Sequence, residues 1–280
     1  MISFDFEYFK PTSIKEAIRL YHELDEQGKK PMYFSGGTEL ITLGRVNQLE
    51  TKAVIDIKSI PECLVLKKDA TRVTLGAVQS LNKIREQKLF PFLDKVIVEI
   101  ADHTARNKIT LGGNLCANII YRETILPLLL TNSQVVIASQ TGIKELPITE
   151  VFNQTLKLEK GEFLVQTITE NKEIDLPSLS VKKRRQWDVG YPLITVAALL
   201  KKGKIKVAIS GLCEFPFRDP QIEECLNNQQ VSKESRIKEA MDQISHPILD
   251  DVHGSAEYRL FVLKNTLEDI LDALEGAKHV

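Results

Sequence analysis

Two glycine pairs constrain this chain more than any other feature of its sequence. Residues 34–40 read FSGGTEL and residues 110–114 read TLGGN, so each pair has small polar neighbours, and each is expected to follow an apolar strand. Glycine allows positive φ and close backbone approach, so consecutive N–H groups can converge on phosphate oxygens. Neither the dinucleotide-binding pattern G-x-G-x-x-G nor the P-loop pattern occurs, so the Rossmann and P-loop mechanisms are not supported. The residues alone leave two alternatives open, two ordinary tight turns or a dinucleotide or phosphate site.

Local patterns predict mixed helices and strands in the first 172 residues. Ser13 and Glu16 form a capping box that opens a helix, and Gly28 ends it. Ser80 starts a short helix, and the stretch from Pro91 to about His103 reads as one longer helix. The other elements are strands at 32–34, 53–57, 65–67, 73–75, 134–139, 143–146 and 162–169, and a helix at 40–46.

The pattern becomes simpler after residues 171–180, which contain Pro177 and read as a domain boundary. Residues 193–200 and 204–210 alternate around Lys202-Gly203, which predicts an antiparallel hairpin. Helices are expected at 221–227, 232–244 and 253–274. The chain therefore reads as an α+β protein with an N-terminal region over 1–172 and a small sheet with helices over 173–280.

Charge and hydropathy narrow the class of function. The 37 basic residues nearly cancel the 38 acidic ones, so nothing in the composition favours nucleic acid or an anionic membrane as a partner. No apolar stretch approaches the ~20 residues that span a bilayer. The first residues lack the basic and apolar regions of a signal peptide, so a cytoplasmic protein without a membrane span is expected.

The four cysteines argue against a metal centre in this chain. They stand at 63, 116, 213 and 225, with no C-x-x-C pair and no histidine at zinc-finger spacing. A local iron–sulfur or zinc site is therefore not expected. All four are expected to be small buried side chains in a reducing compartment. If the protein carries out redox chemistry, its centre is expected to be an organic cofactor.

An ordered set of motifs resembles one protein family. Residues 34–40 and 106–115 resemble the two flavin loops of the FAD-binding (medium) subunits of molybdenum hydroxylases, the xanthine dehydrogenase and carbon monoxide dehydrogenase family. Further similar segments are VIDI at 54–57, LGA at 75–77, the basic stretch 182–188 and residues 250–259. These matches run in order over about residues 6 to 275.

The resemblance implies a fold and a diphosphate site. It predicts a non-Rossmann FAD-binding region of two subdomains, about 1–58 and 59–172, followed by a C-terminal domain. It assigns the FAD diphosphate to the backbone of the first loop, with Glu39 capping the next helix or contacting the cofactor, and to three residues of the second loop. The predicted loop residues are Phe34, Ser35, Gly36, Gly37, Thr38, Glu39, Thr110, Gly113 and Asn114.

The resemblance also assigns four positions to the rest of FAD. Glu123 stands where the family has an aspartate that binds the adenosine part, and its side chain is one methylene longer. Ile100 and Leu164 match positions that pack near the isoalloxazine. Lys182 matches a cation near the ring, where a positive charge would stabilise the anionic reduced flavin. Trp187 and Tyr191 are expected either to cover the ring or to lie in the core.

The implied function is electron transfer rather than attack on a substrate, so no catalytic residue is predicted. The resemblance places molybdopterin on a large partner subunit and 2Fe–2S clusters on a small one. Electrons from those clusters would reach FAD on this chain and leave to an acceptor, NAD⁺ being expected. Two alternatives stay open: a self-sufficient flavin oxidoreductase, and a non-catalytic assembly subunit that has lost FAD.

Overall fold

The computed structural model describes residues 2–184 and 190–276. They form two compact units. Unit 1 comprises the described residues up to Leu89, together with His103–Ala117 and Ser133–Asn171. Unit 2 comprises Phe90–Asp102, Asn118–Asn132 and the described residues from Lys172 onward. The predicted division of the chain into domains at residue 172 stays a prediction.

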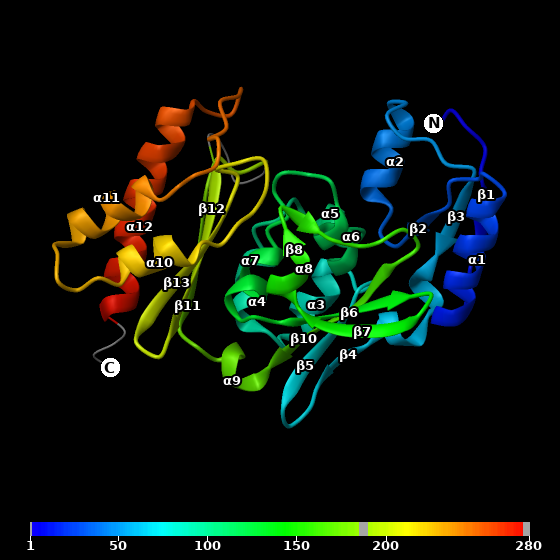
Figure 1. Ribbon diagram of the computed structural model, residues 1–280, viewed down its shortest axis with the longest axis horizontal. Helices are drawn as coiled ribbons and strands as arrows, with labels where there is room; N and C mark the ends of the chain where they lie inside the picture. The colour runs from blue at the N-terminus through cyan, green and yellow to red at the C-terminus, as the bar shows by residue number, and fades with distance from the viewer. Residues whose placement is uncertain (1, 185–189, 277–280) are drawn as a thin grey trace. The chain divides into compact units, whose positions relative to one another are not determined.

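A small parallel sheet carries the first glycine loop of unit 1 (Figure 1). Its order is β1 (Glu7–Phe9), β3 (Ala53–Asp56) and β2 (Met32–Phe34), with both outer strands parallel to β3. Helix α1 (Ile14–Glu26) precedes β2, and helix α2 (Thr38–Arg45) follows it. The Ser13 side chain accepts the N–H of Glu16, which confirms the predicted start of α1.

A second sheet of unit 1 is antiparallel, in the order β4-β5-β10-β6-β7. Its strands are β4 (Leu66–Lys68), β5 (Arg72–Gly76), β10 (Phe163–Glu170), β6 (Gln134–Ser139) and β7 (Gly142–Pro147). The short elements of unit 1 are η1 (Ile57–Ser59), η2 (Pro61–Leu64), α3 (Leu81–Gln87), α5 (His103–Arg106), α6 (Leu111–Cys116), α8 (Ile148–Val151), β8 (Phe152–Asn153) and β9 (Thr155–Leu156). Helix α9 (Asn171–Ile174) begins at the last residue of unit 1, and its other residues belong to unit 2.

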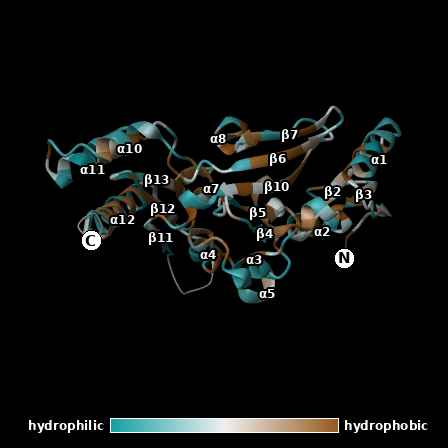
Figure 2. Cartoon of the chain, turned by 90° about the horizontal axis from the view of Figure 1, so that it is seen from below, coloured by the Kyte–Doolittle hydropathy of each residue, from teal (hydrophilic) through white to brown (hydrophobic). Residues whose placement is uncertain are grey.

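One apolar cluster joins the two sheets of unit 1. It includes Ile14 of α1, Ile55 of β3, Val136 of β6 and Val165 of β10, all buried. Figure 2 shows the corresponding contrast in hydropathy, with β6 brown over most of its length and the short polar helix α5 teal. Tyr33 of β2 packs against this cluster. Because burial of apolar surface is the main favourable contribution to folding, this contact helps to hold β2 and the loop that leaves it.

Unit 2 is built on the antiparallel sheet β11-β12-β13. The strands are β11 (Ser178–Lys183), β12 (Ile194–Lys201) and β13 (Lys204–Ser210), and the helices are α4 (Pro91–Ile97), α7 (Ile125–Leu130), α10 (Pro220–Leu226), α11 (Lys233–Asp242) and α12 (Ala256–Gly276). Val196 and Ala198 of β12 share a buried cluster with Leu263 and Ile270 of α12. Side chains alternate along a strand, so Thr195 and Ala197 point to the other face of the sheet.

Most predicted elements are confirmed, with two clear corrections. The single helix expected over 91–103 is wrong, because α4 ends at Ile97 and Ala101 has a left-handed φ of 47°, which an α-helix cannot contain. Strand β11 begins at Ser178, inside the stretch 171–180 expected to be a boundary, so the C-terminal hairpin is in fact part of a three-stranded sheet. Within residues 2–184 and 190–276, no helix is long and apolar enough to cross a membrane.

Candidate functional site

The two glycine loops meet in unit 1 although 75 residues separate them. The hydroxyl oxygens of Ser35 and Thr110 are 2.9 Å apart and share a hydrogen bond. The first loop leaves β2, as predicted. The second does not follow a strand as expected, because α5 precedes it, and Thr110 forms only an isolated bridge with Ser80. The structure therefore brings together the two segments that the sequence predicted to act on one diphosphate.

Glycine is required where the loops approach each other. A Cβ on Gly36 would lie 2.1 Å from the carbonyl oxygen of Lys108, a backbone atom that has little freedom to move aside. Gly37 has φ of +72°, a conformation that side chains rarely adopt. The first loop therefore has no side chain at Gly36 and Gly37 to cover its backbone, and backbone N–H groups in such a loop can reach a phosphate.

The amides of the first loop are available to a ligand. In the described part of the chain, the N–H groups of Gly36 and Gly37 donate to no other residue. Helix α2 starts at Thr38, and no side chain caps its N-terminus. Because the first amides of a helix lack partners within it and carry partial positive charge, this end of α2 favours an anion. Thr38 is exposed, and Glu39 lies partly buried in the first turn of α2.

A charged cluster that the sequence interpretation missed supports the first loop from β1 and β3. Lys58 donates to the carbonyl of Ser35 at 3.1 Å, pairs with Asp56 at 2.9 Å and lies 4.2 Å from the centre of the Phe34 ring. The hydroxyl of Tyr8 donates a hydrogen bond to the carboxylate of Asp56. Burial raises the pKa of Asp56, but the hydrogen bonds from Lys58 and Tyr8 outweigh it and leave the pKa below 3.8. The one available signal was Lys58 standing two residues after β3.

Backbone hydrogen bonds hold the second loop to the segment after β5. The N–H of Leu111 donates to Gln79 at 2.9 Å, and the N–H of Gly112 donates to Ala77 at 2.8 Å. A Cβ on Gly112 would lie 2.7 Å from the Cβ of Ala77, so glycine is needed here for packing. These two amides are therefore not available to a ligand.

The next two amides of the second loop donate to Thr110. The hydroxyl of Thr110 accepts from Gly113 at 3.2 Å, and its carbonyl accepts from Asn114 at 2.9 Å. Thr110 is thus the N-cap of α6. Any contact of FAD with Gly113 or Asn114 has to share these bonds or use the Asn114 side chain. Their predicted role in binding stays a prediction.

Buried Asn82 fixes the chain just before the second loop. Its side-chain amide donates to the carbonyl of His103 at 2.8 Å and to the side chain of Asn107 at 2.7 Å, and its oxygen accepts from Arg106 at 3.1 Å. Buried amides rarely lack partners, and this one makes three hydrogen bonds. Arg106 and Asn107, which carried part of the family resemblance, thus have a structural task in unit 1.

The remaining predicted residues lie in different places. Leu164 is buried in β10 of unit 1. Ile100, Glu123 and Lys182 belong to unit 2, where Lys182 pairs with Glu123 at 2.6 Å and donates to the Glu99 carbonyl at 2.6 Å. Burial raises the pKa of Glu123, and the Lys182 ammonium opposes that rise. A contact of FAD with either charge has to share or replace this ion pair.

The sequence left open whether Tyr191 covers the flavin ring or lies in the core of the protein. Tyr191 is 60% exposed and stacks on Tyr121, with ring centres 4.8 Å apart, so it is not a core residue. Trp187 lies outside the described residues. Arg259 is buried and donates to the carbonyls of Leu193 and Gly211, so its role is structural.

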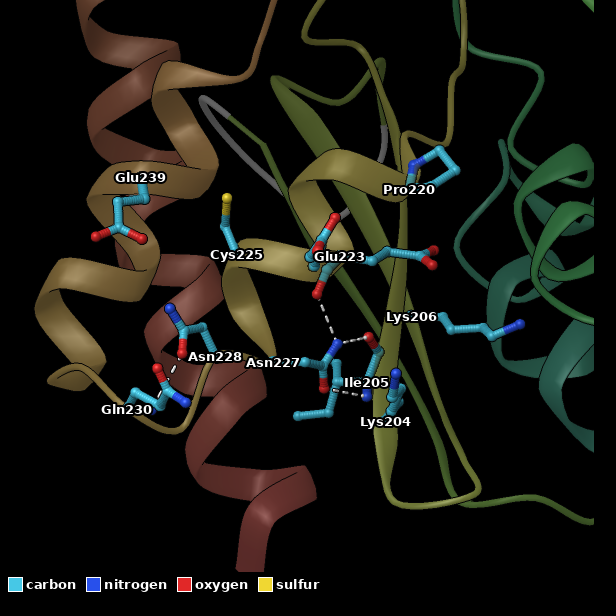
Figure 3. A pocket seen from close by; sticks show the side chains of 11 residues that line it. Lys204, Ile205, Lys206, Pro220, Glu223, Cys225, Asn227, Asn228, Gln230 and Glu239 are labelled. Atoms are coloured by element: carbon cyan, nitrogen blue, oxygen red, sulfur yellow. Dashed lines mark hydrogen bonds between the residues drawn. The ribbon is translucent and has the colours of Figure 1, made fainter.

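Unit 2 also contains a pocket of about 750 Å³ between the start of β13 and helix α10 (Figure 3). Lys204, Lys206 and Cys225 line it, and Glu239 of α11 borders it. The side chain of Asn227 is used by hydrogen bonds to the backbone of Ile205. No residue predicted to bind FAD lines this pocket, and its basic and acidic groups favour no single ligand charge.

The cysteines differ from the expectation in one respect. Cys63 and Cys213 are buried, but Cys225 is partly exposed and Cys116 is exposed. The prediction that all four are buried is wrong for Cys116, because it ends the short helix α6 at the surface. Within the described ranges, no group of three or more His, Cys, Asp or Glu side chains could hold a metal ion.

Comparisons with known proteins agree with this geometry. The model of a family described as FAD binding domain in molybdopterin dehydrogenase matches residues 4–169. The nicotinate dehydrogenase FAD-subunit of Eubacterium barkeri is 24% identical and spans 97% of this chain and 98% of that protein.

Two solved structures share the fold. A carbon monoxide dehydrogenase chain from Hydrogenophaga pseudoflava aligns with a TM-score of 0.85 and 22% identity, over 96% of both chains. A chain of quinoline 2-oxidoreductase from Pseudomonas putida 86 aligns with a TM-score of 0.83 and 23% identity, over 97% of this chain and 98% of that one. The predicted α+β class, with a non-Rossmann region followed by a small antiparallel sheet and helices, is confirmed.

Proposed function

The chain belongs to the family of the FAD binding domain in molybdopterin dehydrogenase, and from this premise we propose that it is the electron-transfer subunit of a molybdenum hydroxylase. It binds FAD, receives electrons from iron–sulfur clusters on a partner subunit and delivers them to an acceptor. The family resemblance found in its motifs is confirmed. The route of the electrons is the part that goes beyond family membership.

The meeting of the two glycine loops is the observation that best supports FAD binding. Ser35 and Thr110 join the loops at 2.9 Å, and Gly36 and Gly37 present amides without a partner among the described residues. The uncapped end of α2 adds positive potential at the same loop. These features suit a diphosphate, which is the most highly charged part of FAD.

The residues of the chain bind and orient, while the cofactor supplies the redox chemistry. When bound, FAD is a carrier that accepts and releases two electrons. In our proposal the backbone of Phe34–Thr38 holds the diphosphate, with Glu39 at the helix that follows. Thr110, Gly113 and Asn114 support the same group. Glu123 is assigned to adenosine, and Ile100, Leu164 and Lys182 to the ring.

The proposed partners are an iron–sulfur small subunit and a molybdopterin large subunit. The names of the relatives support a heteromeric complex, since Eubacterium barkeri nicotinate dehydrogenase has a FAD-subunit. The hydroxylated substrate would bind to the large subunit, and the names nicotinate and quinoline favour an N-heterocycle. We propose NAD⁺ as the acceptor on the resemblance to xanthine dehydrogenase subunits alone, and we propose the cytoplasm as the location.

The first test is the visible absorption spectrum of the purified full chain, followed by identification of any cofactor released on denaturation. A two-banded flavin spectrum with released FAD supports the proposal. A colourless chain that FAD cannot reconstitute, alone or co-expressed with its partner subunits, contradicts FAD binding and favours the assembly alternative. Turnover of a small substrate by the isolated chain would favour a self-sufficient oxidoreductase. Rapid reduction of the bound flavin by NADH would support NAD⁺ as the acceptor.

A further inference from the structure

The contact between Lys58 and the first glycine loop determines which way one peptide group points. The ammonium of Lys58 is 3.1 Å from the carbonyl oxygen of Ser35. That carbonyl belongs to the same planar peptide as the N–H of Gly36. In a trans peptide the C=O and N–H bonds point in opposite directions, so Lys58 on one side directs the Gly36 N–H to the other.

Three neighbours fix Lys58 where this contact requires it. Asp56 pairs with its ammonium at 2.9 Å, and the face of the Phe34 ring lies 4.2 Å away. Tyr8 donates to Asp56 and so orients that carboxylate. The Asp56 side chain is 4% exposed, whereas that of Lys58 is 40% exposed. A buried carboxylate therefore anchors a cation that can still be exchanged by mutation without opening the core.

We infer that Lys58 is a positioning residue for the diphosphate of FAD, and that Asp56 and Tyr8 hold it in place. It acts through the Ser35–Gly36 peptide, whose amide it orients and polarises, because hydrogen bonds in series strengthen one another. This inference rests on the proposed function, since it takes the first loop to be the diphosphate site. It adds a residue from outside both loops to the machinery that binds the cofactor.

The positive charge of Lys58 also bears on selectivity between ligands. Phosphate-containing ligands gain from an oriented amide and a nearby cation, whereas a flavin without phosphate gains from neither. ADP carries the same diphosphate as FAD but no flavin. The inference therefore predicts that substitution of Lys58 weakens FAD and ADP together and leaves riboflavin binding unchanged.

The test is titration of the full apoprotein with FAD, ADP and riboflavin, using flavin fluorescence and competition. Lys58→Met is expected to raise the Kd for FAD and ADP about 10-fold, the size of one lost charge-assisted hydrogen bond. Lys58→Arg keeps the charge and is expected to recover most of the affinity. Lys29→Met is the matched control, since Lys29 pairs with Glu7 at 2.5 Å in unit 1 and touches neither loop.

The outcomes separate the inference from the proposed function. If the wild-type chain binds neither FAD nor ADP, the proposed function fails and the inference fails with it. If the wild type binds both and Lys58→Met binds equally well, only the inference is overturned. The inference is also overturned if Lys29→Met weakens FAD as much as Lys58→Met does, or if Lys58→Met lowers riboflavin affinity by the same factor. A thermal unfolding transition of Lys58→Met like that of the wild type shows that the variant is folded, so its affinities can be compared with those of the wild type.

Discussion

The two glycine loops of unit 1 have similar sequences but opposite hydrogen-bonding states. In the first loop the amides of Gly36 and Gly37 donate to none of the described residues, and the helix that follows has no side-chain cap. In the second loop the amides of Gly112 and Gly113 donate to protein acceptors, and Thr110 caps the helix. A Gly-Gly pair therefore does not by itself identify an anion site.

The difference assigns separate tasks to the two loops. Because the N–H groups of Gly112 and Gly113 already have acceptors within the protein, the second loop can serve as a rigid support for the first loop. The first loop keeps donors without partners, which costs stability unless a ligand or water accepts them. We therefore take the first loop as the part that binds the anion and the second as its support. The following predictions test that division, from the largest expected effect to the smallest.

Gly36→Ala is expected to have the largest effect. Its Cβ would lie 2.1 Å from the Lys108 carbonyl, so the loops must separate. We expect a loss of about 3 kcal/mol in the free energy of unfolding, typical of severe overpacking, and loss of FAD binding. Urea unfolding and flavin titration measure the two effects.

Two other glycines provide the controls for Gly36→Ala. Gly112→Ala is also expected to lower stability, because its Cβ meets Ala77, but its folded fraction should still bind FAD. Gly28→Ala meets no atom within 4 Å and should cost about 1 kcal/mol through its φ of +72° alone. Loss of FAD binding by Gly112→Ala in the folded state would contradict the division of tasks.

Thr38→Asp should change stability and binding in opposite directions. Thr38 is exposed in the first turn of α2, where a negative charge stabilises a helix by about 0.3–1 kcal/mol. The same charge would repel the diphosphate, so we expect FAD affinity to fall about 10-fold. Thr38→Asn introduces a side chain of the same shape as aspartate but without the charge, so it should leave stability and FAD affinity nearly unchanged. An unchanged FAD affinity for Thr38→Asp would show that the anion does not bind at this end of α2.

Thr110→Ala should mainly affect stability. It removes the cap on Gly113 and the hydrogen bond to Ser35. Loss of an N-cap costs about 1 kcal/mol, and we expect the midpoint of urea unfolding to fall accordingly. FAD affinity should change by less than about threefold, because the free amides belong to the other loop. A loss of affinity larger than that of Lys58→Met would reverse the roles assigned to the two loops.

The smallest expected effect is the pH dependence carried by Asp56. Hydrogen bonds from Lys58 and Tyr8 keep the pKa of Asp56 below 3.8 in the folded chain. A lowered carboxylate pKa contributes stability that is present above 3.8 and lost as pH falls through the folded value. The wild type should therefore be more stable than Asp56→Asn at pH 7, and the difference should shrink below about pH 4. A difference that stays constant with pH would show that Asp56 does not act through its charge.

Local patterns predicted much of the fold and the identity of the loops. The capping box at Ser13 predicted the start of α1, and apolar runs predicted β2 and β6 within a residue. These features depend on neighbours a few positions away, so a single sequence contains them. The loop residues were found through the family motifs. The structure places the two loops side by side, joined by the hydrogen bond between Ser35 and Thr110.

The features that were missed depend on distant partners. Tyr8 and Asp56 are 48 residues apart in the sequence and meet because β1 and β3 pair in parallel. Strand β11 pairs with β12 across a long connection, so its short alternation alone resembled a linker. The hydrogen-bonding state of each loop depends on which segment lies beside it. Gln79, which accepts from the second loop, belongs to no motif, and Ala77 belongs to the LGA segment at 75–77, whose sequence says nothing of this hydrogen bond.

The most direct test of the central claim is a spectrum of the glycine amides. The chain has 14 glycines, so selective ¹⁵N-glycine labelling of the full protein gives a spectrum that glycine substitutions can assign. On addition of ADP or FAD, the account predicts large shifts and new protection from exchange for Gly36 and Gly37. The amides of Gly112 and Gly113 should already be protected without ligand and should shift less. Large changes confined to Gly112 and Gly113, with Gly36 and Gly37 unaffected, would contradict the account.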